Sequence, residues 1–451
     1  MIEVVNPATE EVIGTVPAGT PGLVDAAVTR AATAFPTWST TPVEERLAVL
    51  GRVADLITGR ADAFATTMTA EMGTPATFAA KVQVPNPVAI VRDVVAAASA
   101  DFFAAEKVRN SLVLREPVGV VAAITPWNFP LQQMVAKIAP ALAAGAVVVL
   151  KPSELAPLTA VLLGEVLSAA GVPSGVVEII HGTGPVVGEA LASHPLVDMV
   201  SFTGSTRAGR RVSALAAETV KRVTLELGGK SANIVLADAD LTRAVKFGVA
   251  GAFLNNGQAC SALTRLLVPA SKHDEAVGIA VAAAARHRPD DPTLPTTRLG
   301  PLVSAAQRDR VTSYIRKGVA EGARLALGGP EAPRERGHYV TPTVFADVRA
   351  DMTIAQEEIF GPVLSVMPYT DEDDAVRIAN STVYGLAGAV FSADVDHAVT
   401  VAKRLRTGQV DINGAAFNTA APFGGYRQSG NGREFGHHGL TEFTELKSIQ
   451  L

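Results

Sequence analysis

The chain has 451 residues, 48% of them hydrophobic, and a formal net charge of −5. This length supports two or more domains with large cores, and the interspersed charges argue against a nucleic-acid partner or a charged tail. The longest apolar stretch, residues 138–150, is interrupted by Gly145 and falls short of the roughly 20 residues of a membrane helix. The N-terminus lacks the pattern of a signal peptide, so we expect a soluble, cytoplasmic protein.

Helical spacing of apolar residues predicts helices over residues 22–73 and a looser helical stretch over 77–106. Short apolar runs then alternate with helical stretches, and each run ends in a polar or Gly/Pro-rich motif. The runs are residues 118–124, 146–150, 176–180, 199–202 and 222–225. This alternation predicts a parallel sheet covered on both faces. Because ligands bind at the carboxyl ends of such strands, we expect the five motifs to converge on one crevice.

The alternation restarts after Gly229, with strands expected at residues 232–236 and 266–268 and a helix between them. This pattern predicts a second α/β domain that ends near Gly425. The tail, residues 441–451, has strand character but no neighbouring strand in the sequence. We expect it to pair with an edge elsewhere in the chain or in another subunit.

Cys260 is the only cysteine and follows the loop-like sequence Gly257-Gln258-Ala259. A single thiol excludes an intrachain disulfide and a cysteine metal cluster, and it fits a reducing compartment. Free cysteines are most often buried core residues. A loop position near a helix start would instead favour a reactive thiolate. Taken alone, this segment leaves both interpretations open.

Two further residues suit catalysis. Glu226 follows an apolar run, and a carboxyl group at a strand end in an apolar setting suits a general base with a raised pKa. Asn128 can donate its side-chain amide to an oxyanion. The alternatives are a surface glutamate at a strand exit and a turn-forming asparagine beside prolines.

Two further segments suit a nucleotide. Gly204 and Gly209 lie between a predicted strand and a predicted helix, where backbone N–H groups can bind a phosphate. This glycine pattern is weak by itself. Lys151 and Glu154 follow another predicted strand, and a carboxylate there can hold ribose hydroxyls. An ordinary solvated Lys/Glu pair is the alternative.

Together these signals resemble the NAD(P)-dependent aldehyde dehydrogenase superfamily along nearly the whole chain. Seven stretches, in the order of that family, carry the resemblance: residues 126–130 (PWNFP), 151–154 (KPSE), 202–206 (FTGST), 226–230 (ELGGK), 257–260 (GQAC), 357–362 (EEIFGP) and 422–426 (PFGGY). The resemblance implies two Rossmann-like parallel-sheet domains and a small bridging β element. It places the cofactor-binding domain at residues 1–106 and 118–228, the catalytic domain at 229–428, and oligomerisation segments at 107–117 and 437–451.

The resemblance also implies roles for individual residues. Cys260 attacks the aldehyde, Asn128 and the Cys260 backbone N–H hold the oxyanion, and Glu226 activates the water that hydrolyses the thioester. Lys137 is similar to a lysine behind the family's active site. The residues implied in cofactor binding are Trp127, Lys151, Ser153, Glu154, Pro185, Gly204, Ser205, Leu227, Glu358 and Phe360. No metal is implied.

The expected cofactor is NAD, because the carboxylate of Glu154 would repel the 2′-phosphate of NADP; Lys151 softens this preference. Glu226 favours release of the free acid over acyl transfer to coenzyme A, since coenzyme A-acylating relatives usually lack that glutamate. A semialdehyde dehydrogenase and a non-catalytic NAD-binding member remain alternatives. A cysteine hydrolase is weaker, because no histidine lies in a recognisable motif and His437-His438 is expected in a surface loop.

The substrate pocket departs from relatives that carry Trp or Arg at the position of Ala136. Ala136 offers neither a cation–π face nor a carboxylate partner. We therefore expect a roomy apolar pocket for medium or large, apolar or aromatic aldehydes. The residues expected to line it are Phe129, Gln133, Ala136, Ala259, Ser261, Phe417 and Phe423. By resemblance, residues 111–115 and 443–449 form a bridging sheet, and the protein is a homodimer or homotetramer.

Overall fold

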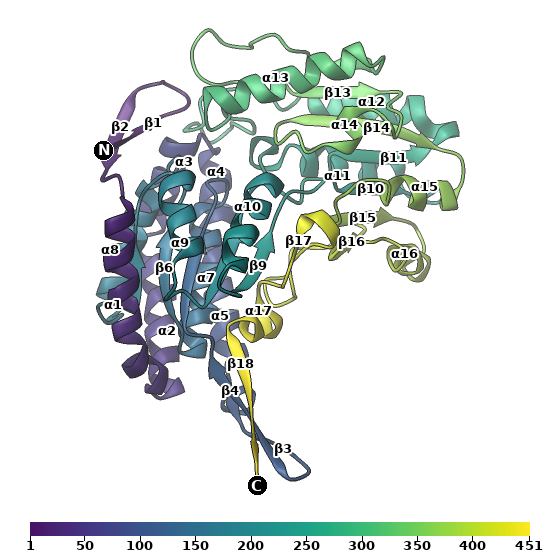
Figure 1. The fold of residues 1–451 in the computed structure, drawn as a ribbon. Helices are drawn as coiled ribbons and strands as arrows, with labels where there is room; N and C mark the ends of the chain where they lie inside the picture. Colours follow the sequence, from purple (N-terminus) through teal and green to yellow (C-terminus); the bar gives the residue numbers. More distant parts are fainter.

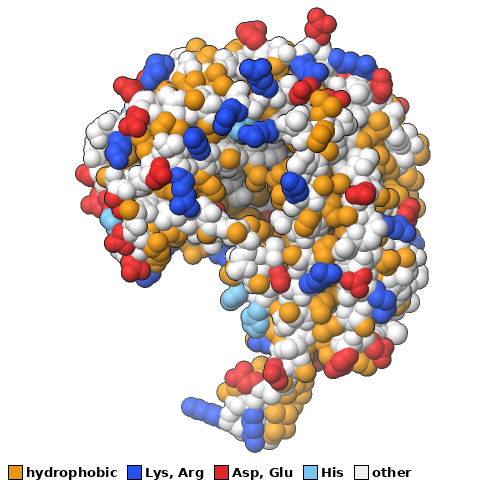
Figure 2. Space-filling view, turned by 180° about the vertical axis from the view of Figure 1, so that it is seen from behind, with side chains coloured by type: hydrophobic (Ala, Val, Ile, Leu, Met, Phe, Trp, Pro, Cys, Tyr) orange, Lys and Arg blue, Asp and Glu red, His pale blue; other side chains and the backbone are white.

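The computed structural model describes residues 1–451. Two large sheets flanked by helices form the body, and a narrow three-stranded sheet projects from it (Figure 1). No helix is both long enough and apolar enough to cross a membrane. Seen from the opposite side, the surface is hollowed near its middle, and Lys and Arg side chains gather around the hollow (Figure 2).

The first sheet has six strands in the order β17-β9-β8-β5-β6-β7. The strands are β5 (Val120–Ile124), β6 (Val147–Lys151), β7 (Val177–Ile179), β8 (Met199–Thr203), β9 (Arg222–Glu226) and β17 (Gly430–Asn431). The five strands predicted from the apolar runs are present and run parallel. β17 is antiparallel to β9 and comes from a segment for which no strand was expected.

Helices cover both faces of the first sheet (Figure 1). One face carries α7 (Pro130–Ala144) and α8 (Leu158–Ala169), over which lie α2 (Val43–Gly59), α3 (Ala61–Met72) and α5 (Pro85–Ala97). The other face carries α1 (Pro21–Thr40), α9 (Glu189–Ser193) and α10 (Thr206–Ala217). The looser stretch at residues 77–106 contains α4 (Ala76–Phe78), a π-helical turn η1 (Ala79–Gln83), α5 and α6 (Ala100–Phe103).

The turn from α7 into β6 shows how local chemistry sets an element boundary. Pro130 stands at the start of α7, where its missing N–H is tolerated. Gly145 ends the helix with φ of +93°, and a Cβ there would approach Arg46 Nη1 to 2.6 Å. Only glycine satisfies both requirements, so the chain leaves α7 and enters β6 without a longer loop.

The second sheet has seven strands in the order β12-β13-β14-β11-β10-β15-β16. The strands are β10 (Ala232–Val235), β11 (Arg265–Pro269), β12 (Arg324–Leu327), β13 (Thr343–Ala346), β14 (Val363–Tyr369), β15 (Ala387–Phe391) and β16 (Gln409–Ile412). Only β12 is antiparallel to its neighbour. Helices α11 (Leu241–Ala252) and α12 (His273–Ala284) pack on one side, and α13 (Ala305–Ala320), α14 (Thr353–Gln356), α15 (Glu372–Ala379) and α16 (Val395–Ala402) complete the domain.

The C-terminal strand finds its partner within the same chain. β18 (Thr444–Gln450) pairs antiparallel with β4 (Ser111–Pro117), which also pairs with β3 (Glu106–Val108). This confirms the strand predicted for the tail and answers which edge it joins. The three strands project beyond both large sheets (Figure 1). A separate N-terminal hairpin consists of β1 (Ile2–Val5) and β2 (Val12–Val16).

The prediction that His437 and His438 lie in a surface loop is wrong. Both residues lie in the short helix α17 (Gly436–Glu442), although both are exposed as expected. Helical spacing buries Gly436, Gly439 and Leu440 on the inner face and leaves the histidines outside. The ring of His437 contacts the edge of Phe102, with ring centroids 5.1 Å apart.

Candidate active site

A cavity of about 460 Å³ lies where strands of the first sheet end and loops of the second sheet approach them. The segments that follow β5, β8 and β9 contribute Pro126, Trp127, Asn128, Gln133, Thr203, Gly204, Ser205, Thr206, Arg207, Leu227 and Gly228. The second half of the chain contributes Cys260, Gln307, Arg310, Glu358, Phe360 and Tyr384. Three of the five predicted strand-end motifs therefore meet here. The motifs after β6 and β7, with Lys151 and Pro185, lie outside this lining.

Cys260 reaches the cavity from a turn between the 3₁₀ turn η3 (Leu254–Gly257) and β11. No helix begins after it, so the expectation that a helix start favours the thiolate is wrong. The side chain is only partly exposed, and burial raises the pKa of the Cys260 thiol to about 12. The nearby carboxyl groups of Glu358 and Glu226 shift this pKa in the same direction. The thiol of the free protein is therefore protonated at neutral pH.

The high pKa of Cys260 predicts the pH dependence of its alkylation by iodoacetamide. Because only the thiolate reacts, we expect the rate to rise about tenfold per pH unit between about pH 7 and pH 10. Mass spectrometry of the intact protein measures this rate without interference, since the chain has no other cysteine. A Cys260→Ala variant should remain unlabelled. A rate that levels off below about pH 8 would contradict the raised pKa.

A buried hydrogen-bond network fixes Asn128 beside the loop that carries Cys260. The Asn128 side-chain amide donates to the carbonyl oxygen of Gln258 at 3.1 Å. Asn255 donates from Nδ2 to the carbonyl oxygens of Asn128 at 2.8 Å and Gln258 at 3.3 Å. Asn255 has left-handed backbone angles (φ 49°, ψ 46°), which aim its side chain at both carbonyls.

Two residues from the N-terminal third complete this network. Gln83 donates from Nε2 to the carbonyl oxygen of Asn128 at 3.3 Å and to Asn255 Oδ1 at 3.1 Å. The Thr74 hydroxyl donates to the same Asn255 oxygen at 2.8 Å. All of these side chains are buried. The network therefore joins the segment after β5 to the Cys260 loop through groups that cannot exchange their partners for water.

Glu226 ends β9 in a buried position, and neither of its carboxyl oxygens has a hydrogen-bond partner. Burial raises its pKa well above the usual value, and the neighbouring Glu434 raises it further. Glu434 is itself paired with the buried ammonium group of Lys137, with Nζ and Oε1 2.6 Å apart. Glu226 does not line the cavity, but its charge acts on the Cys260 thiol. A carboxyl group in this setting can take up and release a proton.

The first turn of α10 forms another part of the cavity wall. Ser205 caps the helix by accepting a hydrogen bond from the Ala208 N–H at 3.3 Å, and Gly204 precedes it. Both line the cavity together with Thr206 and Arg207. The unpaired backbone N–H groups of a helix start attract anions. The turn predicted to bind a phosphate therefore lies in the cavity wall at the start of α10.

Glu358 and Phe360 enter the cavity from the second half of the chain. Glu358 accepts a hydrogen bond from the Gly229 N–H at 3.2 Å, and burial raises the pKa of its carboxyl group to about 7. A Cβ at Gly228 would lie 2.2 Å from Glu358 Oε2, so this approach requires glycine. Phe360 meets Trp127 edge to face, with ring centroids 5.4 Å apart.

Lys151, the last residue of β6, forms an ion pair with Glu154, with Nζ and Oε2 2.9 Å apart. Lys151 is buried and also donates to the Pro152 carbonyl oxygen at 3.0 Å, whereas Glu154 is half-exposed. The alternative that Lys151 and Glu154 form an ordinary solvated pair is therefore wrong for Lys151, which is buried. Ser153 accepts from the Leu155 N–H at 3.2 Å. Pro185 lies in the adjoining π turn η2 (Gly184–Gly188).

A family comparison places these features in context. The model of the aldehyde dehydrogenase family matches residues 1–449. The chain belongs to the aldehyde dehydrogenase family. The resemblance drawn from the seven sequence stretches is thereby confirmed. Family members oxidise aldehydes, so this aldehyde dehydrogenase is an oxidoreductase that acts on the aldehyde group.

Individual relatives of this aldehyde dehydrogenase are close. A 3-succinoylsemialdehyde-pyridine dehydrogenase of a Pseudomonas species is 51% identical, covering 99% of this chain and 94% of the relative. A crystal structure of a cysteine-to-alanine variant of aldehyde dehydrogenase C from Pseudomonas syringae, in complex with NAD+ and octanal, has 49% identity and a TM-score of 0.98, over 100% of this chain and 93% of that one. Betaine aldehyde dehydrogenase from Staphylococcus aureus, in complex with NAD+, has 37% identity and a TM-score of 0.96, over 99% and 91%.

Of the residues expected in the substrate pocket of this aldehyde dehydrogenase, only Gln133 lines the 460 Å³ cavity. Ala136, Ala259 and Phe423 are buried, Phe129 and Ser261 are half-buried, and Phe417 is 41% exposed. Phe417 and Phe423 stack edge to face, with ring centroids 6.1 Å apart. Phe423 and Phe417 thus form one aromatic cluster, outside the walls shared with Cys260.

Sequence reasoning missed three cavity residues of this aldehyde dehydrogenase, Gln307, Arg310 and Tyr384. Gln307 donates from Nε2 to the Phe360 carbonyl oxygen at 2.8 Å, and Arg310 donates to the Glu358 carbonyl oxygen at 2.7 Å. Both lie on α13, whose polar face looks like any solvated helix surface. No local signal distinguishes them, because their role arises from packing against a segment about 50 residues away.

Gln83 gives the first prediction on activity. Replacing Gln83 by Ala should lower kcat/KM for aldehydes by about 10- to 100-fold, because the Asn128 carbonyl loses one of its two donors and Asn255, the other donor, loses the contact that orients it. Gln83→Glu should be equally impaired, since a carboxylate cannot donate to the Asn128 carbonyl. Steady-state kinetics with a thermal melt measure both effects. The control is Lys81→Ala, an exposed residue on the same turn; normal kinetics in both Gln83 variants would refute this positioning role.

Proposed function

We propose that this protein oxidises an aldehyde to the carboxylic acid with reduction of NAD, through a covalent intermediate on Cys260. The observation that carries the proposal is the shared cavity: Cys260, Asn128 and the start of α10 line the same 460 Å³ space. A thiol, an amide donor and an anion-binding helix start within one cavity suit attack on a carbonyl beside a dinucleotide.

The residues present fit NAD. Gly204 and Ser205 at the start of α10 would hold the pyrophosphate, and Glu358 would hold the nicotinamide ribose beside Trp127 and Phe360. Lys151 and Glu154, with Ser153 and Pro185 nearby, would hold the adenosine part. Leu227 would contact the cofactor inside the cavity of Cys260, whose wall it lines. The carboxylate of Glu154 favours a ribose hydroxyl over a phosphate, so NAD is preferred to NADP. When bound, the nicotinamide accepts the hydride from the substrate carbon. Two structural relatives were crystallised with NAD+, which supports this choice.

The protein's own groups supply the remaining chemistry. Sγ of Cys260 bonds to the aldehyde carbon as the thiol proton passes to water, and the resulting oxyanion receives hydrogen bonds from Asn128 Nδ2 and the Cys260 N–H. Loss of hydride leaves a thioester on Cys260. Glu226 then takes a proton from water, and the hydroxide adds to the thioester carbon. The C–S bond breaks, the proton passes from Glu226 to Sγ, and the carboxylic acid leaves. The Lys137–Glu434 pair adjusts the proton affinity of Glu226.

A free-acid product is favoured over acyl transfer to coenzyme A. Glu226 is buried, has a raised pKa and influences the Cys260 thiol, and these properties suit a base that activates water. Acyl transfer to coenzyme A needs no such base, and it remains the second candidate.

The substrate is proposed to be a medium or large, apolar or aromatic aldehyde. Two relatives support this size class: one is named for a pyridine-containing semialdehyde, and another was crystallised with octanal. The absence of a bulky side chain at Ala136 and the small residues beside Cys260 agree with a wide approach. A short semialdehyde substrate is the alternative.

The test is a screen of NADH formation with NAD and with NADP across octanal, benzaldehyde, acetaldehyde and succinic semialdehyde. We expect the highest kcat/KM with octanal or benzaldehyde and NAD, and free acid as the product by chromatography. Activity only with succinic semialdehyde would contradict the substrate assignment. A thioester formed only in the presence of coenzyme A would contradict hydrolysis.

Ala136 provides a prediction on substrate size. Ala136→Trp should lower kcat/KM for octanal by about tenfold or more and change acetaldehyde less, because the indole occupies the space of the longer chain. Ala136 is buried on α7, so a thermal melt must accompany the kinetics. Ala136→Leu, which adds less volume, should show a smaller effect of the same sign. Full octanal activity in a folded Trp variant would contradict the assignment.

We also propose that residues 1–106 and 118–228 bind the cofactor, that residues 229–428 carry catalysis, and that the β18-β4-β3 sheet joins subunits into a homodimer or homotetramer. The projecting sheet exposes Val108, Leu446 and Ile449, and exposed apolar residues at an open sheet edge favour pairing with another chain. Light scattering after size-exclusion chromatography tests the assembly, and a monomer would contradict it.

A further inference from the structure

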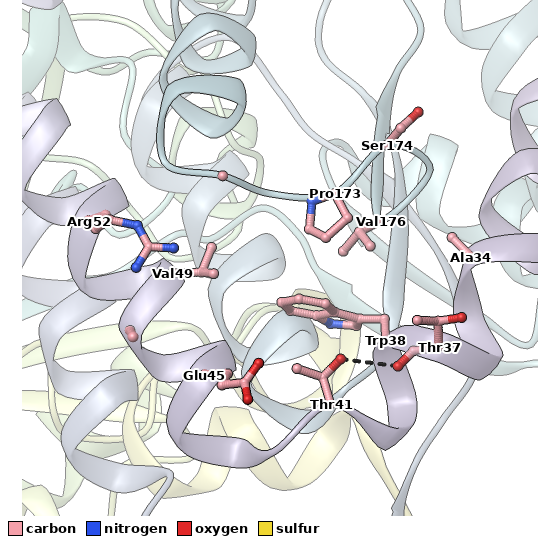
Figure 3. Close-up of a pocket in the computed structure, with 12 residues that line it drawn as sticks. Ala34, Thr37, Trp38, Thr41, Glu45, Val49, Arg52, Pro173, Ser174 and Val176 are labelled. Carbon is pink, nitrogen blue, oxygen red and sulfur yellow. Dashed lines mark hydrogen bonds between the residues drawn. The ribbon is translucent and has the colours of Figure 1, made fainter.

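A second cavity, of about 570 Å³, lies at the amino-terminal ends of the strands of the first sheet. It is open to solvent on one side and is lined by α1, α2 and the segment of residues 171–176, which leads from α8 into β7 (Figure 3). That segment precedes a strand and therefore stands at the amino ends of the parallel strands. The cavity that holds Cys260 lies at their carboxyl ends. The sheet therefore separates the two cavities.

The centre of this second cavity is an aromatic and aliphatic surface. The indole of Trp38 lies amid the group, with Pro173 and Val176 on one side and Thr41 and Glu45 on the other (Figure 3). Val49 completes the apolar part of the lining. Trp38 is 3% exposed, and its Nε1–H has no hydrogen-bond partner. A buried indole N–H usually has an acceptor, so this unpaired donor is a reason to expect a polar ligand.

Arg52 supplies a positioned cation on the rim. Its Nε donates to the Ala170 carbonyl oxygen at 2.8 Å, which holds the guanidinium beside the cavity. That bond is the only one Arg52 makes, so its two terminal nitrogens remain available as donors. In Figure 3 the guanidinium extends from α2 toward the other lining residues. A carboxylate is the group that this planar pair of donors matches.

Glu45 lies two helical turns from Arg52 on the same side of α2, and it forms no ion pair with Arg52. Seven residues of α-helix separate their Cα atoms by about 10 Å. The cavity therefore presents a cation at one end, an anion at the other and an apolar surface between them. A second carboxylate on a ligand would be repelled at the Glu45 end, whereas a hydroxyl group would be accepted there.

We propose that this second cavity is a binding site for an aromatic monocarboxylate, with the ring against Trp38 and the carboxylate on the terminal nitrogens of Arg52. The volume suits a ligand of this size. The proposed oxidation of aldehydes also produces carboxylates. That the reaction product is a ligand of the second cavity is therefore an inference that rests on the proposed function. Binding at the site itself does not depend on it.

The two tryptophans of the chain make the test direct, because Trp38 lines the second cavity and Trp127 lines the cavity of Cys260. In a Trp127→Phe variant, all indole fluorescence comes from Trp38. We expect 4-hydroxyphenylacetate to change this emission saturably, and Arg52→Gln in the same background to weaken binding by about tenfold or more. Arg316→Gln, which alters an exposed arginine on α13, is the matched control and should leave binding unchanged.

The negative charge of Glu45, at the end of the cavity away from Arg52, provides a second comparison. Terephthalate, which carries a second carboxylate, should bind more weakly than 4-hydroxyphenylacetate, and Glu45→Gln should reduce this difference. Calorimetry on the protein with both tryptophans repeats the Arg52→Gln comparison should the Trp127 variant fail to fold. A Trp38 emission that does not change, or binding that is equal with and without Arg52, would overturn the proposal. Either result leaves the oxidation of aldehydes, measured separately, unaffected.

Discussion

Replacing Cys260 by Ala is expected to abolish aldehyde oxidation while leaving NAD binding intact. The thiol forms the only covalent bond between the protein and the substrate in the proposed reaction, so its loss should lower kcat by about 10⁴-fold or more. The remaining cavity wall, which includes Trp127, Gly204 and Glu358, is unchanged by this substitution. NADH formation measures the first effect, and calorimetry with NAD measures the second.

The outcome separates catalysis from folding. An unchanged melting temperature and NAD affinity in Cys260→Ala would locate the loss in the chemical step. Residual oxidation within about tenfold of the unmodified protein would show that another group attacks the aldehyde. Ser168→Ala is the control, because it changes an exposed side chain on α8 that does not line the cavity.

Replacing Glu226 by Gln is expected to block the second half of the reaction. The first turnover should still produce one equivalent of NADH per subunit, and the steady-state rate should fall by about 10²- to 10⁴-fold, because no base activates water. Mass spectrometry should detect the acyl group on Cys260. A full loss of the first turnover would contradict this division of roles. The control is Glu357→Gln, whose carboxyl group accepts a hydrogen bond from Tyr314 at 2.6 Å and does not line the cavity.

The pH dependence follows from the raised pKa of Glu226. Hydrolysis requires the carboxylate, so the steady-state rate should rise with pH through the raised pKa, and this limb should disappear in Glu226→Gln. The free energy of unfolding changes in the opposite direction to the rate: it falls as pH rises. The folded state binds the proton more tightly than the unfolded state, whose carboxyl group has a pKa near 4.5. The stabilisation from protonated Glu226 is therefore lost as pH rises from this value through the folded pKa, and denaturation of Glu226→Gln should lack it.

Much of the architecture follows from local sequence patterns. Apolar runs bounded by Gly/Pro-rich motifs predicted the five parallel strands of the first sheet, because fully buried strands need uninterrupted apolar residues. The same reasoning placed Glu226 at the end of β9 and the Gly204-Ser205 turn before α10. The short strand β17 and the helix that holds His437 were missed. Both are short, glycine-containing segments, and whether such a segment forms a strand or a helix depends on the distant parts of the chain that pack against it.

By itself, the sequence determined the strand–helix order, the motifs at the strand ends and the resemblance to the aldehyde dehydrogenase family. These features depend on residues close together along the chain, and local patterns report them reliably. The tertiary structure alone decided the contacts between distant residues: Lys137 with Glu434, Gln83 with Asn128 and Asn255, and Arg310 with the Glu358 backbone. It also decided the pKa of Cys260. A thiol beside a helix start and a thiol enclosed among carboxyl groups can share the same neighbours in sequence, and only burial and the surrounding charges distinguish them.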